Sequence, residues 1–136
     1  MSTATSTPVR EAAQRLLDAA RTGTPCPPVR DLIGATDVAT AYAVQQQLTE
    51  ARLAAGARVV GHKIGLTSAA VQRQLGVDSP DFGVLFDDMD VSAADVVDLS
   101  ALLQPRVEAE VAFVLAKDVN PAIEDDKLKV FVGVTP

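Results

Sequence analysis

Two glutamates, Glu108 and Glu110, have the spacing that points most directly to chemistry. They lie in a stretch, 106–115, whose alternating apolar residues predict a β-strand, and side chains two positions apart on a strand share a face. Adjacent carboxylates repel each other unless a cation compensates them, and hard divalent cations prefer oxygen ligands. The pair therefore predicts a metal site open to substrate. The alternative is a solvated strand face on which Arg106 pairs with the glutamates.

A lysine between two glycines is the second such feature. In the stretch 58–66, which is typical of a strand, Lys63 shares its face with Gly61 and Gly65. Glycine inside a strand often marks a place where a ligand or another backbone comes close. Lys63 is thus a candidate for reaching an anionic substrate or transferring a proton. The alternative is an exposed lysine on an edge strand, with the glycines serving a bend.

Helices precede the strands that would position these side chains. Capping and periodicity predict one helix that begins at Thr7–Pro8 and ends at Gly23, and a second over about 37–55 that Gly56 ends. The packing stripe of the second helix is predicted to consist of Val38, Ala41, Tyr42, Leu48 and Ala55.

The rest of the chain carries mostly strand signals. After the strand at 58–66, Ser68 and Gly76 bound a short helix, 78–81 is typical of a turn, and 84–86 is a short strand. The stretch 106–115 is the clearest strand, and 130–134 is a candidate for a last one. Two helices followed by strands indicate an α+β fold.

Composition narrows the class of function. A net charge of −6 and a pI near 4.6, without clustered Lys and Arg, argue against nucleic acid as a partner. No apolar run is long enough to span a membrane, and the Ser/Thr-rich start is neither a signal peptide nor an anchor. The single cysteine, Cys26, cannot form an internal disulfide. These features predict a cytoplasmic protein.

Three segments together resemble the 2-keto-4-pentenoate hydratases of the fumarylacetoacetate hydrolase superfamily, which act in the meta-cleavage breakdown of aromatic compounds. They are GHKIGLTS (61–68), VQRQLGVDSPDFGVLFDDM (71–89) and QPRVEAEVAFVL (104–115), within a resemblance that spans roughly 9–117. The combined motifs are specific for the hydratase and its sister, 4-oxalocrotonate decarboxylase. PDFG and EAE resemble the hydratase more.

The resemblance implies a site and a reaction. Glu108 and Glu110 would be ligands of Mg²⁺ or Mn²⁺, Lys63 would be the active-site lysine, and Asp81 would line the same pocket. The substrate would be the small molecule 2-hydroxypenta-2,4-dienoate or a close analogue, hydrated to 4-hydroxy-2-oxopentanoate. Pro121-Ala122-Ile123-Glu124 is similar to the segment that carries a third metal ligand in the family, and the alternative for Glu124 is a chance match.

By the same resemblance, the chain corresponds to the front half of such an enzyme. It would consist of an N-terminal helical segment (1–57), the front half of a mixed β-sheet or β-roll of the fumarylacetoacetate hydrolase type (58–117), and a divergent or truncated tail (118–136). An incomplete sheet leaves open edges, so we expect a homo-oligomer or association with another superfamily chain. The alternatives are a decarboxylase-like lyase and an inactive fragment that binds a partner chain.

Overall fold

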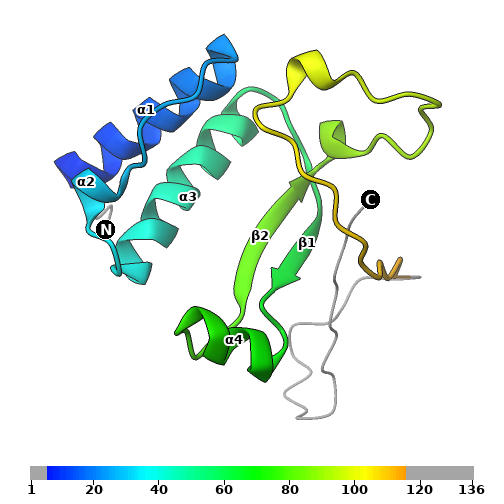
Figure 1. The fold of residues 1–136 in the computed structure, drawn as a ribbon. Coiled ribbons are helices and arrows are strands. Elements are labelled where there is room, and N and C mark those ends of the chain that lie inside the picture. The colour runs from blue at the N-terminus through cyan, green and yellow to red at the C-terminus, as the bar shows by residue number, and fades with distance from the viewer. Residues whose placement is uncertain (1–5, 116–136) are drawn as a thin grey trace. The chain divides into compact units, whose positions relative to one another are not determined.

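The computed structural model describes residues 6–115, which fall into two compact units. Within the described residues, the helical unit consists of 6–58 together with Asp87–Pro105, and the hairpin unit consists of Val59–Phe86 together with 106–115. Figure 1 shows helices packed together in the first unit and a β-hairpin in the second. The described residues thus have the expected α+β character, while the segment boundaries at 57 and 117 stay predictions.

Helix α1, Thr7–Thr22, forms where capping signals predict a helix. Pro8 lies in its first turn, where its fixed φ suits a helix and its missing N–H costs no hydrogen bond. Gly23 ends it with a φ of 64°, a left-handed conformation that glycine adopts without strain. The predicted end is confirmed, whereas the helix begins one residue earlier than predicted, with Ser6 rather than Thr7 as its N-cap.

Helix α3, Val38–Ala54, is capped at its N-terminus by a side chain. The carboxylate of Asp37 accepts a hydrogen bond of 2.9 Å from the backbone N–H of Thr40, which satisfies a donor that the helix leaves without a partner. Gly56, with a φ of 97°, follows the helix as predicted. A four-residue helix, α2 (Arg30–Ile33), was not predicted because it is a single turn after a proline-rich connector.

The core of the helical unit lies between α1 and α3. Val9, Ala12 and Ala13 of α1 pack with Val44 of α3, and all four side chains are buried. Small alanines let the two helices approach closely. The predicted stripe of α3 is largely wrong: Val38 and Tyr42 are exposed, and only Leu48 of that set packs against the core. Apolar residues are spread around α3, so contact with α1, rather than periodicity, selects the buried face.

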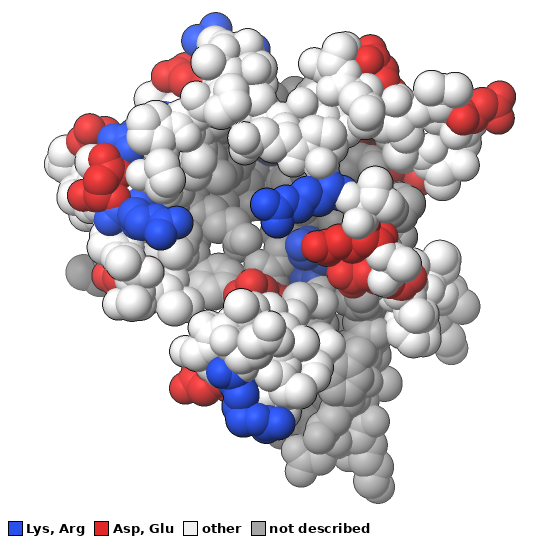
Figure 2. All heavy atoms as spheres, viewed as in Figure 1, with Lys and Arg blue, Asp and Glu red and all other residues white. Residues whose placement is uncertain are grey.

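Ion pairs connect the elements of this unit at its surface. The guanidinium of Arg15 on α1 donates to both carboxylate oxygens of Asp31 on α2, at 2.8 and 3.0 Å. Arg21 pairs with Asp18 one helical turn away, at 3.2 Å. Over the helical elements, Figure 2 accordingly shows basic side chains next to acidic ones rather than a continuous basic patch.

The hairpin unit is built on two antiparallel strands, β1 (Val59–Gly65) and β2 (Asp81–Phe86). Helix α4, Ala69–Leu75, connects them. Ser68 caps α4 by accepting a hydrogen bond from the Ala70 N–H, and Gly76 ends it with a φ of 71°, both as predicted. Strand β2 begins earlier than the predicted 84–86, because pairing with β1 extends the ladder to Asp81.

The stretch 106–115 differs from its prediction. It forms neither a helix nor a strand, because in the described residues β1 and β2 pair only with each other. Its apolar side chains are exposed, with Val107 at 90% and Val114 at 97% of full exposure. The sheet of the described residues is therefore two-stranded and antiparallel rather than mixed. The β-roll stays a prediction, and the candidate strand at 130–134 lies outside the described residues.

Two other sequence features can be placed. Cys26 is a free, half-buried thiol in the connector between α1 and α2. None of the helices in residues 6–115 combines the length and the apolar character that a membrane span requires.

Candidate active site

Lys63 lies in the middle of β1, and the strand register defines its neighbours. Gly61 pairs with Leu85, Lys63 with Gly83, and Gly65 with Asp81. Because alternate residues of a strand share a face, these six residues lie on one side of the hairpin. The predicted glycine neighbours of Lys63 are confirmed. The register adds a third glycine, Gly83, directly across the ladder.

Asp81 joins the same face as Lys63. It pairs with Gly65, and a Cβ built on Gly65 would lie 3.7 Å from the Asp81 Cβ. Asp81 is therefore the diagonal neighbour of Lys63, a separation that long side chains bridge. Both side chains are exposed, and no ion pair joins them within the described residues. The sequence placed Asp81 in a turn; the register places it in the strand beside the lysine's glycine.

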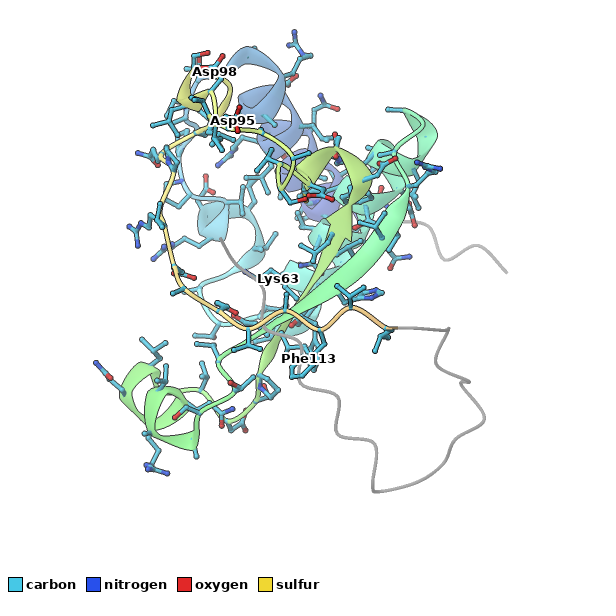
Figure 3. All side chains as sticks on the ribbon, turned by 90° about the vertical axis from the view of Figure 1, so that its right-hand side faces the viewer. Lys63, Asp95, Asp98 and Phe113 are labelled. Atoms are coloured by element: carbon cyan, nitrogen blue, oxygen red, sulfur yellow. The ribbon has the colours of Figure 1, made fainter. Side chains whose placement is uncertain are left out.

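The two glutamates lie in the stretch 106–115, which forms neither a helix nor a strand. Glu110 lines an open hollow of about 390 Å³ together with the end of β1, Ile64 and Gly65. Figure 3 shows this stretch, marked by Phe113, passing beside the sheet that carries Lys63. Glu108 and Lys63 do not line the hollow. Neither glutamate forms an ion pair with Arg106 in the described part of the chain, but both side chains are exposed, so the solvated-face alternative stays open.

Leu66, at the rim of the same hollow, holds an uncommon backbone conformation. Its φ is 56°, a left-handed value that costs a residue with a Cβ about 1–2 kcal/mol. The amide Nε2 of Gln72, on α4, donates a hydrogen bond of 2.6 Å to the Leu66 carbonyl and so holds this turn. Sequence reasoning missed both residues, because nothing in a leucine or a glutamine signals a positive φ. Strain of this kind tends to occur at functional sites.

The oxygen donors of Glu108 and Glu110 partly fit the divalent metal that the sequence predicts. Carboxylate oxygens suit Mg²⁺, and Glu108 and Glu110 keep theirs free of ion pairs within residues 6–115. Those same residues, however, contain no group of three or more acidic, histidine or cysteine side chains that could hold a metal ion. Glu124, the third predicted ligand, lies outside them. The pair therefore has suitable chemistry, but it is an incomplete site by itself.

A second hollow, in the helical unit, has different electrostatics. About 720 Å³ in volume, it is lined at its polar side by Arg52, Arg58, Asp87 and Asp88. Arg52 pairs with Asp88, and Arg58 pairs with Asp87 at 2.9 Å. Hydrogen bonds from the backbone N–H and the guanidinium of Arg58 hold the pKa of the Asp87 carboxyl below its usual value. Because each guanidinium already has a carboxylate partner, this hollow is a structural junction rather than an anion site.

Solved structures resemble this chain over about two thirds of its length. The chain is 32% identical to 4-oxalocrotonate decarboxylase from Pseudomonas putida G7 complexed with calcium and acetate, with a TM-score of 0.56 over 65% of this chain and 34% of that chain. The same enzyme complexed with magnesium and adipate matches with a TM-score of 0.55. No protein-family model matches the sequence.

Curated sequences are more similar still. The chain is 52% identical over 120 residues to the TodF product hydratase of Pseudomonas putida. This match covers 88% of this chain and 45% of that protein. It is 54% identical over 110 residues to a 2-keto-4-pentenoate hydratase of Paraburkholderia xenovorans, and 56% identical over 111 residues to a 2-keto-4-pentenoate hydratase of Dechloromonas aromatica.

These matches cover 81% of this chain in both cases, and 41% and 42% of those relatives. The predicted resemblance is confirmed: over 81% of its length the chain is similar to 2-keto-4-pentenoate hydratases. It spans less than half the length of the curated relatives that it matches.

Proposed function

We propose that this chain supplies the lysine and two of the carboxylates of a metal-dependent hydratase, which adds water to 2-hydroxypenta-2,4-dienoate to give 4-hydroxy-2-oxopentanoate. The observation that carries the proposal is the position of Glu110 in a hollow beside β1, the strand that exposes Lys63 on a face lined by glycines. The hydratase names of relatives about half identical to the chain support the same reaction.

The candidate residues divide into metal ligands and proton-transfer groups. Glu108 and Glu110 hold Mg²⁺ or Mn²⁺, with further ligands from outside residues 6–115. The bound cation would supply electrostatic stabilisation for the negative charge that develops on the substrate oxygens. Lys63 moves a proton between the substrate and solvent, which its exposed position on an open strand face allows. Asp81, on the same face, orients the lysine or the incoming water.

The magnesium found with a structural neighbour supports a divalent ion, and the calcium of a second complex supports a site with hard oxygen ligands. The expected homo-oligomer or complex with another superfamily chain remains part of the proposal, as does a cytoplasmic location. So does the β-roll architecture, of which the described hairpin would be one portion.

Turnover tests the proposal directly. The full chain is incubated with 2-hydroxypenta-2,4-dienoate in the presence and in the absence of Mg²⁺. We expect Mg²⁺-dependent hydration that Lys63→Ala and Glu110→Gln each lower by more than about tenfold, roughly 1.4 kcal/mol. Arg73→Ala, which removes an exposed cation from α4, is the matched control and keeps turnover within about twofold.

Other outcomes select the alternatives. Consumption of 2-oxo-3-hexenedioate without hydration of the dienoate indicates the decarboxylase-like lyase, for which the structural neighbours are the supporting observation. A monomer on size-exclusion chromatography with no turnover of either compound indicates an inactive fragment. Turnover that survives Lys63→Ala contradicts the role assigned to the lysine.

A further inference from the structure

The side chain of Lys63 lies directly over Gly83. A Cβ built on Gly83 would lie 2.8 Å from the Cγ of Lys63, 3.2 Å from its Cδ and 4.0 Å from its Cε. The aliphatic stem therefore crosses β2 at the one position in the ladder that faces it and has no side chain. Carbon atoms that are not bonded pack at about 3.5–4.0 Å, so a methyl group at 83 and this path of the lysine exclude each other.

The other two glycines on this face behave differently. A Cβ on Gly61 would meet Leu85 Cδ1 at 3.6 Å, and one on Gly65 would meet the Asp81 Cβ at 3.7 Å. Both are ordinary van der Waals contacts. Neither glycine contacts the lysine in this way, although both flank it along β1.

The backbone at Gly83 does not itself require glycine. Its φ lies outside the left-handed region, in contrast to Gly76 and Gly56. Alanine would fit the strand conformation there, and glycine inside a strand is a destabilising choice compared with residues that have a side chain. The absence of a Cβ at this position therefore serves the neighbour that occupies the space, Lys63.

We infer that Gly83 is a positioning residue for Lys63: by leaving the surface of β2 bare, it lets the lysine stem lie flat across the strand and so fixes where the amine is held. This inference deepens the proposed function, since its kinetic consequence rests on the role of Lys63 there. A side chain at 83 would push the flexible stem into another rotamer and move the amine away from the face that it shares with Asp81.

Lysine NMR tests the inference without relying on turnover. The amines of the full chain are reductively methylated with ¹³C-formaldehyde, and the Lys63 signal is assigned by its loss in Lys63→Arg. Lys117, Lys127 and Lys129 are the other lysines of the sequence and serve as references in the same spectrum. We expect Gly83→Ala to shift the Lys63 methyl signal by several linewidths, and the matched controls Gly61→Ala and Gly65→Ala to leave it within one linewidth. An unchanged Lys63 signal in Gly83→Ala overturns the inference.

A double-substitution cycle covers the case in which Gly83→Ala folds poorly. If the clash with Lys63 is the cause, Gly83→Ala combined with Lys63→Ala recovers the thermal midpoint of Lys63→Ala alone. If the two backgrounds lose the same number of degrees, Gly83 is needed for another reason and the inference is wrong.

Turnover is then measured separately. With the lysine displaced, Gly83→Ala lowers kcat by about tenfold or more and leaves KM within about twofold. It has no further effect in the Lys63→Ala background. A Lys63 signal that shifts in Gly83→Ala supports the positioning role of Gly83, whatever the turnover. Unchanged turnover in Lys63→Ala rejects the proposed role of the lysine. Failure of the inference and failure of the proposed function are therefore distinguishable.

Discussion

Asp87 accepts hydrogen bonds from both the backbone N–H and the guanidinium Nε of Arg58, each at 2.9 Å. In return, the backbone N–H of Asp87 donates to the Arg58 carbonyl at 2.9 Å. Arg58 directly precedes β1 and Asp87 directly follows β2. The pair therefore joins the two chain segments that flank the open end of the hairpin. The single carboxylate of Asp87 accepts hydrogen bonds from a backbone donor and a side-chain donor.

Removal of this carboxylate should loosen the junction. We expect Asp87→Ala to lower the thermal midpoint by about 2–5 °C, because the Arg58 N–H and guanidinium both lose their acceptor. Asp95→Ala removes the same charge from an exposed position for which no hydrogen bond is described, and it should leave the midpoint within about 1 °C. Differential scanning calorimetry makes the comparison. Equal shifts in the two variants would show that net charge, rather than the junction, is responsible.

Acid should weaken the helical unit through its paired carboxylates. Hydrogen bonds from the Thr40 backbone N–H and hydroxyl hold the pKa of Asp37 below its usual value, and the Arg15 guanidinium does the same for Asp31. A carboxyl with a lowered folded-state pKa stabilises the fold above the usual pKa, near about 3.9, and this contribution is lost as the pH falls through the lowered pKa. The thermal midpoint should therefore be flat from about pH 7 to 5 and fall below about pH 4.

Asp37→Asn separates the cap from its titration. Asparagine caps a helix as well as aspartate does but carries no proton equilibrium in this range. We expect the variant to match the parent protein near pH 7 and to lose less of its thermal midpoint below pH 4, when both are followed by far-UV circular dichroism. Curves that stay parallel through the acid range would remove Asp37 from the explanation.

The core between α1 and α3 depends on Val44. This side chain is 3% exposed, and Val44→Ala leaves a void against Val9 and the α1 alanines. We expect the free energy of unfolding in urea to fall by about 1–3 kcal/mol. Val38→Ala, the same change in the same helix at a side chain that is 60% exposed, should cost no more than about 0.5 kcal/mol. A similar loss in both would mean that α3 buries its other face.

The turn at Leu66 depends on Gln72. Loss of the amide that bonds the Leu66 carbonyl should cost about 0.5–1.5 kcal/mol, even though alanine is a better helix former than glutamine. Gln74→Ala, at an exposed position of α4, removes an amide without a described partner and should be neutral or slightly stabilising. Amide hydrogen exchange provides a local check, since protection around residues 65–68 should drop in Gln72→Ala alone.

Local signals in the sequence predicted much of the fold. Glycine at 23, 56 and 76 and the cap at Ser68 predicted helix ends correctly, because these signals act within one turn. The face of α3 could not be predicted, since its apolar residues are spread around the helix and α1 selects among them. The stretch 106–115 has strand periodicity without a strand partner in the described residues, and pairing is a long-range property that periodicity does not contain.

In the candidate site, too, the local features could be predicted and the tertiary ones could not. The i and i+2 rule placed Lys63 with Gly61 and Gly65 correctly, because that geometry is local to one strand. Gly83 and the strand position of Asp81 follow only from the register between β1 and β2, which no pattern within either strand specifies. The grouping of Glu110 with the end of β1 likewise depends on tertiary structure, and the metal role of the two glutamates stays a prediction.

The connector between α1 and α2 carries the sole thiol of the sequence, half-buried at Cys26. One maleimide fluorophore or nitroxide would therefore attach at one known place, with no cysteine to remove beforehand. Because the thiol is partly covered, its alkylation rate would also report how often this connector opens. Local fluctuations of the helical unit could therefore be measured without any catalytic assay.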